Sequence, residues 1–398
     1  MFKRKSILIV SPYVTFPDEP GANRFISIAN MLSSYYDVTL VTSNFCHILK
    51  AQRHKVYQNS RFKTILLNET GYKKNVSISR LLSHKIFCNN FQTFLKVNGY
   101  KFDLIYSAFP LIYTNFLLGK YKDKFKYKLI IDVQDTWPDS IAGPIPLLAS
   151  PVGKLVLFPI NKYANKTYSY ADGLVAVSNT YLNRADITNL PSNRKKVVYI
   201  GTDRKLDTNS YNYSSKENQP LLAIYIGTMA GSYDLETIVR AAALCKGKVK
   251  IEFIGTGEDE NKLKNLNSKL GNNVNFLGLL PYKDAMNKLA KADIAINPIK
   301  EKAAASITNK LSDYLALGLP ILSCQNNKEV IDLLTANGNF HYTSGNSREL
   351  ASKLLYIENH RSILAAVSQK NFLFAKENLS RDISYTEIFN LIETVLEL

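Results

Sequence analysis

Short, continuously apolar runs recur along the chain, and they constrain its fold more than any other feature. In the first half the runs lie at 6–11, 38–43, 62–67, 103–107, 129–133, 174–178 and 197–200. In the second half they lie at 221–226, 249–254, 274–277, 294–297 and 321–324. Strands buried on both faces of a parallel sheet have this continuous pattern. Helical patterns at 24–35, 235–244 and 284–292 separate the runs, so the sequence predicts a doubly wound α/β architecture.

These runs are too many for one ordinary sheet, and two Rossmann-like parallel-sheet domains are the simpler arrangement. The stretch 204–220 is polar, poor in aliphatic residues and closed by proline, so we interpret it as a linker. We expect an N-terminal domain at 1–203 and a C-terminal domain at 221–375. A C-terminal helix at 376–398 is expected to pack back on the N-terminal domain.

The chain of 398 residues has a formal net charge of +17, which is unevenly distributed. Residues 1–200 contain 27 Lys or Arg against 11 Asp or Glu, whereas residues 201–398 contain 23 against 22. This asymmetry indicates that the N-terminal half meets an anionic partner: a phosphate-bearing lipid, a nucleic acid or an acidic substrate. A solvated basic surface is the alternative interpretation.

Several classes of protein are disfavoured by the sequence. The four cysteines form no CxxC motif, the histidines have no metal-ligand spacing, and no Asp-x-Asp occurs, so no metal is expected. The apolar run at 7–10 is too short for a secretory signal, and the stretch 140–160 contains prolines and a lysine. We therefore expect a protein that remains in the cytoplasm and does not span a membrane.

Ligands of open α/β sheets bind beyond the carboxyl ends of the strands, so the turns that follow strands are the candidate sites. The turn PDEPGANR at 17–24 contains Gly21 and Arg24, and amides at the start of its helix could hold an anion. The segment IIDVQDTWPDS at 130–140 places Asp132, Asp135 and Asp139 around the only tryptophan, Trp137. These carboxylates could bind sugar hydroxyls or act as a general base, and helix capping is the alternative.

Two further turns lie in the second half. The segment YIGTMAGSYD at 225–234 contains Gly227 and Gly231 and could cradle a phosphate, but it lacks a dinucleotide fingerprint. The segment SITNKLSDYLALGLPIL at 306–322 predicts a short helix capped by Thr308 or Ser306, with Lys310 and Asp313 one turn apart. Lysine at a helix N-terminus indicates a diphosphate site, and the carboxylate could hold ribose hydroxyls. A surface ion pair between the two side chains is the alternative.

The order and spacing of several motifs resemble the group 1 family of retaining glycosyltransferases. The motifs are PGANR, ADGLVAVSNTYLN, VVYIGTD, FIGTGEDENKL, VNFLGLLPYKD and NKLSDYLALGLPIL. DTWPDS is also similar to a motif of members that build bacterial capsule and O-antigen repeats. The resemblance implies the GT-B architecture, in which two Rossmann-like domains face a central cleft. The first departure is Ala305, where the family has its first glutamate, together with Asp313, where it has its second. The second departure is that 228–233 contains no basic residue, whereas the family has Arg and Lys there.

The resemblance implies sugar transfer with retention from a nucleotide diphosphate sugar, UDP being expected from family frequency. Lys310 would stabilise the leaving diphosphate, and Asp135 would assist deprotonation of the incoming hydroxyl. The expected donor-binding residues are Gly227, Thr228, Gly231, Gly255, Gly257, Leu279, Ser306, Ile307, Thr308, Asn309 and Asp313. The expected acceptor-binding residues are Gly21, Arg24, Trp137 and Asp139. The resemblance implies no cofactor and no metal.

The acceptor is expected at the N-terminal domain. A basic segment at 77–97 has apolar residues at roughly helical spacing, which suits contact with an anionic membrane, although packing against the sheet explains the pattern equally well. A polyprenyl diphosphate-linked acceptor would account for both the charge and this helix, at the inner face of the plasma membrane. The alternatives are a homologue that has lost catalysis and acts as a binding protein, and a sugar-nucleotide epimerase of the same fold. Binding of nucleic acid is disfavoured by the neutral second half.

Overall fold

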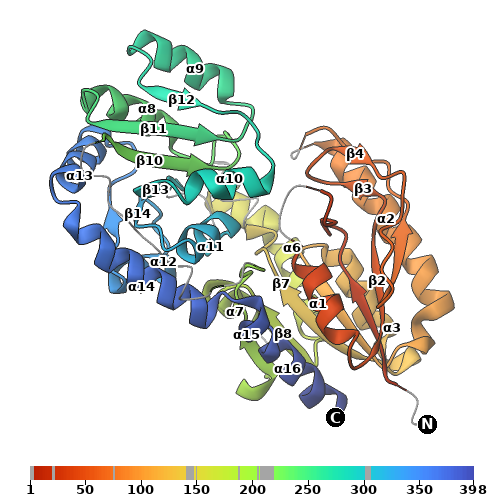
Figure 1. Cartoon of the computed structure of the whole chain (residues 1–398). Coiled ribbons are helices and arrows are strands. Elements are labelled where there is room, and N and C mark those ends of the chain that lie inside the picture. The colour runs from red at the N-terminus through yellow and green to blue at the C-terminus, as the bar shows by residue number, and fades with distance from the viewer. Residues whose placement is uncertain are drawn as a thin grey trace. The chain divides into compact units, whose positions relative to one another are not determined.

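Two parallel sheets organise the chain, and each belongs to a separate unit (Figure 1). The computed structural model describes residues 4–19, 23–74, 77–139, 148, 150–186, 189–203, 206, 219–300 and 306–398. Unit 1 comprises Met1–Tyr199 and Tyr385–Leu398, and unit 2 comprises Ile200–Ser384. The chain therefore passes from unit 1 to unit 2 near residue 199 and returns near residue 385, whereas the sequence predicted boundaries at 203 and 375. Most of the predicted linker at 204–220 lies outside the described residues.

The sheet of unit 1 has seven strands in the order β5-β2-β1-β6-β7-β8-β9, and every pairing is parallel. Its strands are β1 (Ser6–Val10), β2 (Asp37–Ser43), β5 (Lys63–Leu67), β6 (Leu104–Phe109), β7 (Lys128–Val133), β8 (Gly173–Ala176) and β9 (Lys195–Val197). A separate hairpin joins β3 (Phe45–Cys46) and β4 (Ala51–Gln52). Each strand of the main sheet overlaps a predicted apolar run; the hairpin was not predicted.

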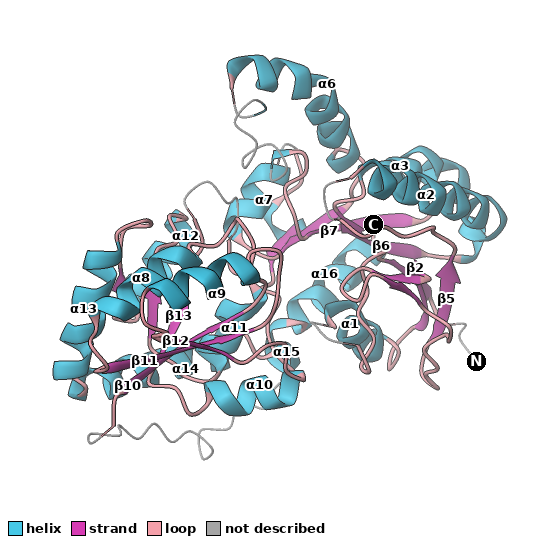
Figure 2. Ribbon diagram, turned by 90° about the horizontal axis from the view of Figure 1, so that it is seen from above, coloured by secondary structure: helices cyan, strands magenta, loops and turns pink. Residues whose placement is uncertain are grey.

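Helices cover both faces of this sheet (Figure 2). They are α1 (Arg24–Leu32), α2 (Ile78–Asn98), α3 (Ile112–Phe125), α6 (Pro151–Tyr168), α7 (Asn179–Ala185) and α16 (Thr386–Leu396), with short 3-10 turns η1 (Gly99–Lys101) and η2 (Ser192–Arg194). Ile7 and Ile9 of β1 face the core beneath α1 and α16, and Leu8 and Val10 face the core beneath α2, α3 and α6. Successive side chains of β1 thus enter the cores on opposite faces of the sheet, and the whole run must therefore be apolar.

The sheet of unit 2 has six parallel strands in the order β12-β11-β10-β13-β14-β15. They are β10 (Leu221–Ile226), β11 (Val249–Ile254), β12 (Val274–Phe276), β13 (Ile294–Asn297), β14 (Ile321–Ser323) and β15 (Phe340–His341). Its helices are α8 (Leu235–Leu244), α9 (Glu260–Lys269), α10 (Tyr282–Leu289), α11 (Asn309–Ala316), α12 (Lys328–Ala336), α13 (Ser347–Asn359), α14 (Ser362–Asn378) and α15 (Arg381–Ser384). Both units have the predicted doubly wound architecture.

Candidate functional site

Three turns stack against one another at the carboxyl edge of the sheet in unit 2. The Gly227 amide donates to the carbonyl of Ile254 at 2.9 Å, and the Gly255 amide donates to the carbonyl of Gly278 at 2.8 Å. A Cβ atom at residue 255 would lie 2.0 Å from the Gly227 carbonyl oxygen, and one at residue 257 would lie 2.2 Å from that of Met229. Gly227 and Gly255 also have φ angles of +143° and +131°, which side chains rarely adopt. Glycine is therefore required for this stacking.

The ammonium group of Lys310 lies directly at the first of these turns. A Cβ atom at residue 227 would be 2.6 Å from Lys310 Nζ. Nζ lies 3.7 Å from the centroid of the Tyr233 ring and donates to Tyr225 Oη at 3.4 Å. Tyr225 Oη in turn donates to the Thr228 carbonyl at 2.7 Å. The lysine is thus held against two aromatic rings, beside backbone amides that follow β10.

The surroundings of Lys310 lower the pKa of its ammonium group. Burial lowers the pKa of Lys310 from 10.5 to about 7, because desolvation disfavours the charged ammonium. The ion pairs found among the described residues do not include Lys310. A bound anion would supply the missing negative charge and would favour the protonated amine.

The helix α11, which carries Lys310, begins as predicted. The Thr308 side chain accepts from the Leu311 amide at 3.3 Å, so Thr308 is the N-cap and Ser306 is not. Ser306 is buried and its hydroxyl donates to Glu329 at 3.2 Å, Ile307 is also buried, and Asn309 is exposed at the helix start. Ala305, the position of the missing family glutamate, lies outside the described residues.

Asp313 lies one turn from Lys310 but points to a different partner. It accepts from the Tyr282 hydroxyl of α10 at 2.7 Å, and burial raises its pKa from 3.8 to about 6. The alternative of a Lys310–Asp313 surface ion pair is therefore not what the structure shows. The remaining predicted donor residues, Leu279 and Gly231, lie in the exposed turns after β12 and β10.

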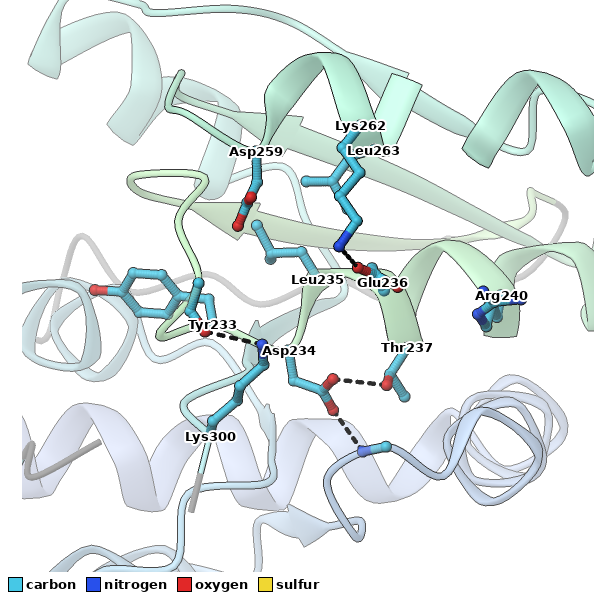
Figure 3. Close-up of a pocket in the computed structure, with 12 residues that line it drawn as sticks. Tyr233, Asp234, Leu235, Glu236, Thr237, Arg240, Asp259, Lys262, Leu263 and Lys300 are labelled. Carbon is cyan, nitrogen blue, oxygen red and sulfur yellow. Dashed lines mark hydrogen bonds and ion pairs between the residues drawn. The ribbon is translucent and has the colours of Figure 1, made fainter. Parts of the chain in front are cut away.

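A polar pocket of about 410 Å³ adjoins this region at the start of α8 (Figure 3). It shares Gly231 and Tyr233 with the stacked turns. Lys300 donates to the Gly231 carbonyl at 2.8 Å, and Lys262 pairs with Glu236 across the pocket. Asp234 is committed to the fold, because it accepts from Thr237 and from the Gly345 amide, both at 2.7 Å. The pocket therefore places further polar side chains next to Tyr233.

The predicted acceptor residues of unit 1 that the structure describes have different surroundings. Arg24 is only 4% exposed and pairs with the fully buried Asp132 at 3.0 Å. It also donates to the Tyr199 carbonyl at 3.0 Å, so the structure gives Arg24 a place inside the fold instead of an anion-binding position. Asp139 pairs with Arg184, and Asp135 accepts from the Thr136 amide at 2.7 Å. Gly21 lies outside the described residues.

A second polar cluster, which the sequence did not reveal, lies at the carboxyl edge of the sheet in unit 1. It contains Tyr13, His47, Tyr72, His84 and Trp137. Four of these residues come from loops that follow β1, β3, β5 and β7, and His84 comes from α2. Their sequence signal is only that each loop residue stands shortly after a strand. Metal-ligand spacing is a different pattern, and no cluster of three or more His, Cys, Asp or Glu suited to a metal occurs in the described ranges.

Comparison with known proteins relates part of the sequence to a family and the whole chain to solved structures. Residues 220–360 match the family of "Glycosyl transferases group 1". The whole chain resembles the solved structure of HepE from Anabaena in complex with UDP and glucose, with 15% identity, a TM-score of 0.67 and coverage of 99% of this chain and 100% of that one. Residues 220–360 thus match the group 1 glycosyltransferases, and the whole chain has the fold of GT-B glycosyltransferases. No curated protein matches its sequence.

Two other solved structures support the same fold for this chain. Sucrose-phosphate synthase from Thermosynechococcus elongatus has 12% identity and a TM-score of 0.74, with coverage of 99% of this chain and 100% of that one. WaaG, a glycosyltransferase involved in lipopolysaccharide biosynthesis, has 14% identity and a TM-score of 0.66, with coverage of 98% and 99%. The family match at 220–360 lies within unit 2, which also contains the stacked turns and Lys310.

Proposed function

We propose that this glycosyltransferase moves a sugar, with retention of anomeric configuration, from a UDP-sugar to a lipid-linked oligosaccharide in the assembly of a bacterial surface polysaccharide. The placement of Lys310 carries the donor part of the proposal. Its ammonium lies at the turn after β10, beside the start of α11. Amide groups at a helix start and a half-buried cation together suit a diphosphate.

The chemistry follows from charge. Negative charge grows on the departing diphosphate when the anomeric carbon–oxygen bond breaks, and Lys310 would stabilise that charge. The departing phosphate would take the proton of the incoming hydroxyl, with Asp135 as the assisting group. Asp313 would hold the ribose hydroxyls of the donor, with Tyr282 fixing the carboxylate. These roles require no metal. Solved HepE structures contain UDP and UDP-glucose, which supports UDP as the nucleotide.

The surface of unit 1 supports an acceptor at a membrane. The first turn of α2 exposes Ile78, Leu81 and Leu82, whereas Phe87 and Phe91 further along the helix are fully buried. The exposed start of α2 therefore suits contact with a membrane, whereas the buried part of the helix packs against the sheet. The first turns of α6 likewise expose Val152, Leu155, Val156, Phe158 and Ile160. Both helices begin at the carboxyl edge of the sheet, because each follows a parallel strand. Within the described part of the chain, no helix is long and apolar enough to span a bilayer.

Donor binding and turnover test the proposal. The chain is titrated with UDP and GDP, and a panel of UDP-sugars is then incubated with a lipid diphosphate-linked sugar acceptor. We expect tighter binding of UDP and a product that keeps the anomeric configuration of the donor in its NMR spectrum. Lys310→Ala should lower kcat by about 100-fold or more with the fold intact. Lys328→Ala, which changes an exposed lysine of unit 2, is the matched control. Unchanged turnover in Lys310→Ala, or an inverted product, would contradict the mechanism.

A further inference from the structure

The sheet of unit 2 has a point at which its strand order reverses. From β10 the chain adds β11 and β12 on one side, and then β13, β14 and β15 on the other. Open α/β sheets bind ligands at the carboxyl ends of the two strands that flank such a reversal. Here these strands are β10 and β13, and their direct pairing ends at Ile224 and Ala295. Both strands continue beyond this pairing, to Ile226 and Asn297.

The hydroxyl of Tyr314, a residue of α11, joins the two strands beyond their direct pairing. It accepts from the Ile226 amide of β10 at 3.1 Å and donates to the Ile296 carbonyl of β13 at 3.4 Å. Tyr314 is fully buried, and burial raises its pKa above the usual range, so the hydroxyl keeps the proton that it donates. Tyr314 thus links β10 to β13 in the place of a backbone hydrogen bond.

Tyr314 and Lys310 lie on the same face of α11, because they are four residues apart. Lys310 Nζ donates to Tyr225 Oη, and Tyr314 Oη accepts from Ile226, the next residue of β10. Gly227, the start of the turn at which the ammonium lies, follows directly. A buried hydroxyl one helical turn from the ammonium therefore fixes α11 to the end of β10.

A second set of buried hydrogen bonds holds the chain just before α11. Gln325, which follows β14, donates through Nε2 to the Ser306 carbonyl at 3.0 Å and accepts from Asn297 Nδ2 at 2.9 Å. A carbonyl oxygen can only accept, so Gln325 must turn its NH₂ group to Ser306 and its oxygen to Asn297. These three residues are at most 3% exposed. The Ser306 hydroxyl also donates to Glu329 at 3.2 Å.

The side chain of Asn297 has a cost to stability. Its Nδ2 also donates to Ser323 Oγ at 3.0 Å, but within the part of the chain that the structure describes its Oδ1 is buried without a hydrogen-bond partner. A buried acceptor without a partner destabilises a fold, so stability alone does not account for this amide. What the amide provides is the orientation of Gln325, which holds Ser306 three residues before α11 begins.

We propose that Tyr314 and Gln325 are positioning residues of the donor site, and that they hold α11 so that the Lys310 ammonium stands at the carboxyl ends of β10 and β13. The inference rests on the proposed function, because it takes Lys310 to bind the donor diphosphate. Tyr314 acts through the two strands, and Gln325 acts through Ser306. A charge stabilises a leaving group best when its position is fixed in advance, so a small displacement of α11 slows transfer.

The pKa of Lys310 in the UDP-free protein reports its surroundings without any turnover. NMR of protein labelled with ¹³C at lysine Cε measures this pKa, and Lys310→Met identifies the signal. Tyr314→Phe removes one oxygen atom, and Gln325→Met removes the amide at similar volume. Burial holds the pKa of Lys310 at about 7, so both variants should raise it towards 10.5, by about one pH unit or more. In both variants kcat/KM should fall about 10- to 100-fold.

Asn267→Leu is the matched control. Asn267 is a buried amide of α9 that bonds to the carbonyl and amide of Val274, at 2.9 and 3.0 Å. Its loss should destabilise unit 2 but leave the pKa of Lys310 and kcat/KM unchanged. An equal rise of the pKa in this control would overturn the proposal, because the effect would then come from general loosening.

The remaining outcomes separate the positioning role from the proposed function. An unchanged pKa of Lys310 in Tyr314→Phe or in Gln325→Met would refute the role of that residue. If Lys310→Ala transfers sugar at the normal rate while Tyr314→Phe still raises the pKa of Lys310, the proposed function fails and the positioning of the lysine stands.

Discussion

At the scale of single residues, the proposed donor site depends on how Lys310 is surrounded. The sequence identified the lysine, the glycine turns and the capped helix, because each has a local pattern. It did not identify Tyr225 and Tyr233 as the rings beside the ammonium, or Tyr282 as the partner of Asp313. Those contacts join turns and helices that are distant in sequence, and only the sheet order brings them together.

The same reasoning applies to the carboxylates of unit 1. Asp132, Asp135 and Asp139 are close in sequence around Trp137, but their partners differ. Asp132 is the last but one residue of a buried strand, so its carboxylate faces the core and needs the buried cation of Arg24. His47 and His84 were missed because their partners lie on other loops. Local spacing predicts helix caps and turns well but not which loops meet at a sheet edge.

Protonation of Lys310 gives a prediction at this scale. Because its pKa in the free protein is about 7, most of the amine is neutral at pH 8. UDP should restore the ammonium, so binding at pH 8 should take up close to one proton, and the affinity for UDP should fall as the pH rises above 7. Calorimetry in two buffers of different ionisation enthalpy measures the uptake. Lys310→Met should show none of it; equal proton uptake by that variant would contradict the assignment.

At the scale of elements, the sequence predicts the positions of the strands better than it predicts which part of a helix packs on a sheet. Continuous apolar runs identified the strands of both main sheets except β15. This strand has only two residues, Phe340 and His341, which is too few to give a pattern. For α2 and α6, the spacing of apolar residues could not show which part of each helix packs on the sheet. That depends on how far the helix extends past the edge of the sheet, and Figure 2 shows the first turns of α6 extending away from it.

The exposed turns of α6 predict a membrane contact that can be measured. Leu155 and Phe158 are 75% and 62% exposed, and burying two such side chains in a bilayer contributes about 3–6 kcal/mol. Leu155→Ser with Phe158→Ser should therefore reduce binding to vesicles containing phosphatidylglycerol by at least about tenfold, as measured by co-sedimentation. Leu244→Ser, at an exposed leucine of unit 2, should have no effect. If the double variant sediments with vesicles as before, α6 is not a membrane contact.

At the scale of the whole molecule, the end of the chain completes the unit in which the chain begins. Figure 1 shows α16 beside β8, and its Ile388, Leu391, Ile392 and Val395 are fully buried in the core formed with α1 and the sheet of unit 1. A sequence pattern predicts that such a segment is helical and apolar on one face. The apolar face alone does not decide between two similar sheets, so the expectation that the C-terminal helix packs on the N-terminal domain goes beyond this pattern.

Removing part of this contact should therefore destabilise unit 1 while leaving the proposed donor site of unit 2 in place. Leu391→Ala should lower the free energy of unfolding of unit 1 by about 2–5 kcal/mol, because the cavity beneath α16 cannot close fully. Trp137 is the only tryptophan and belongs to unit 1, so its fluorescence during urea unfolding reports on that unit alone. We expect its transition to move to lower urea, with UDP binding in native buffer unchanged. Asn390→Ala, at an exposed position of the same helix, should leave the transition in place. A Leu391→Ala chain that keeps the Trp137 transition but loses UDP binding would mean that α16 stabilises unit 2 instead.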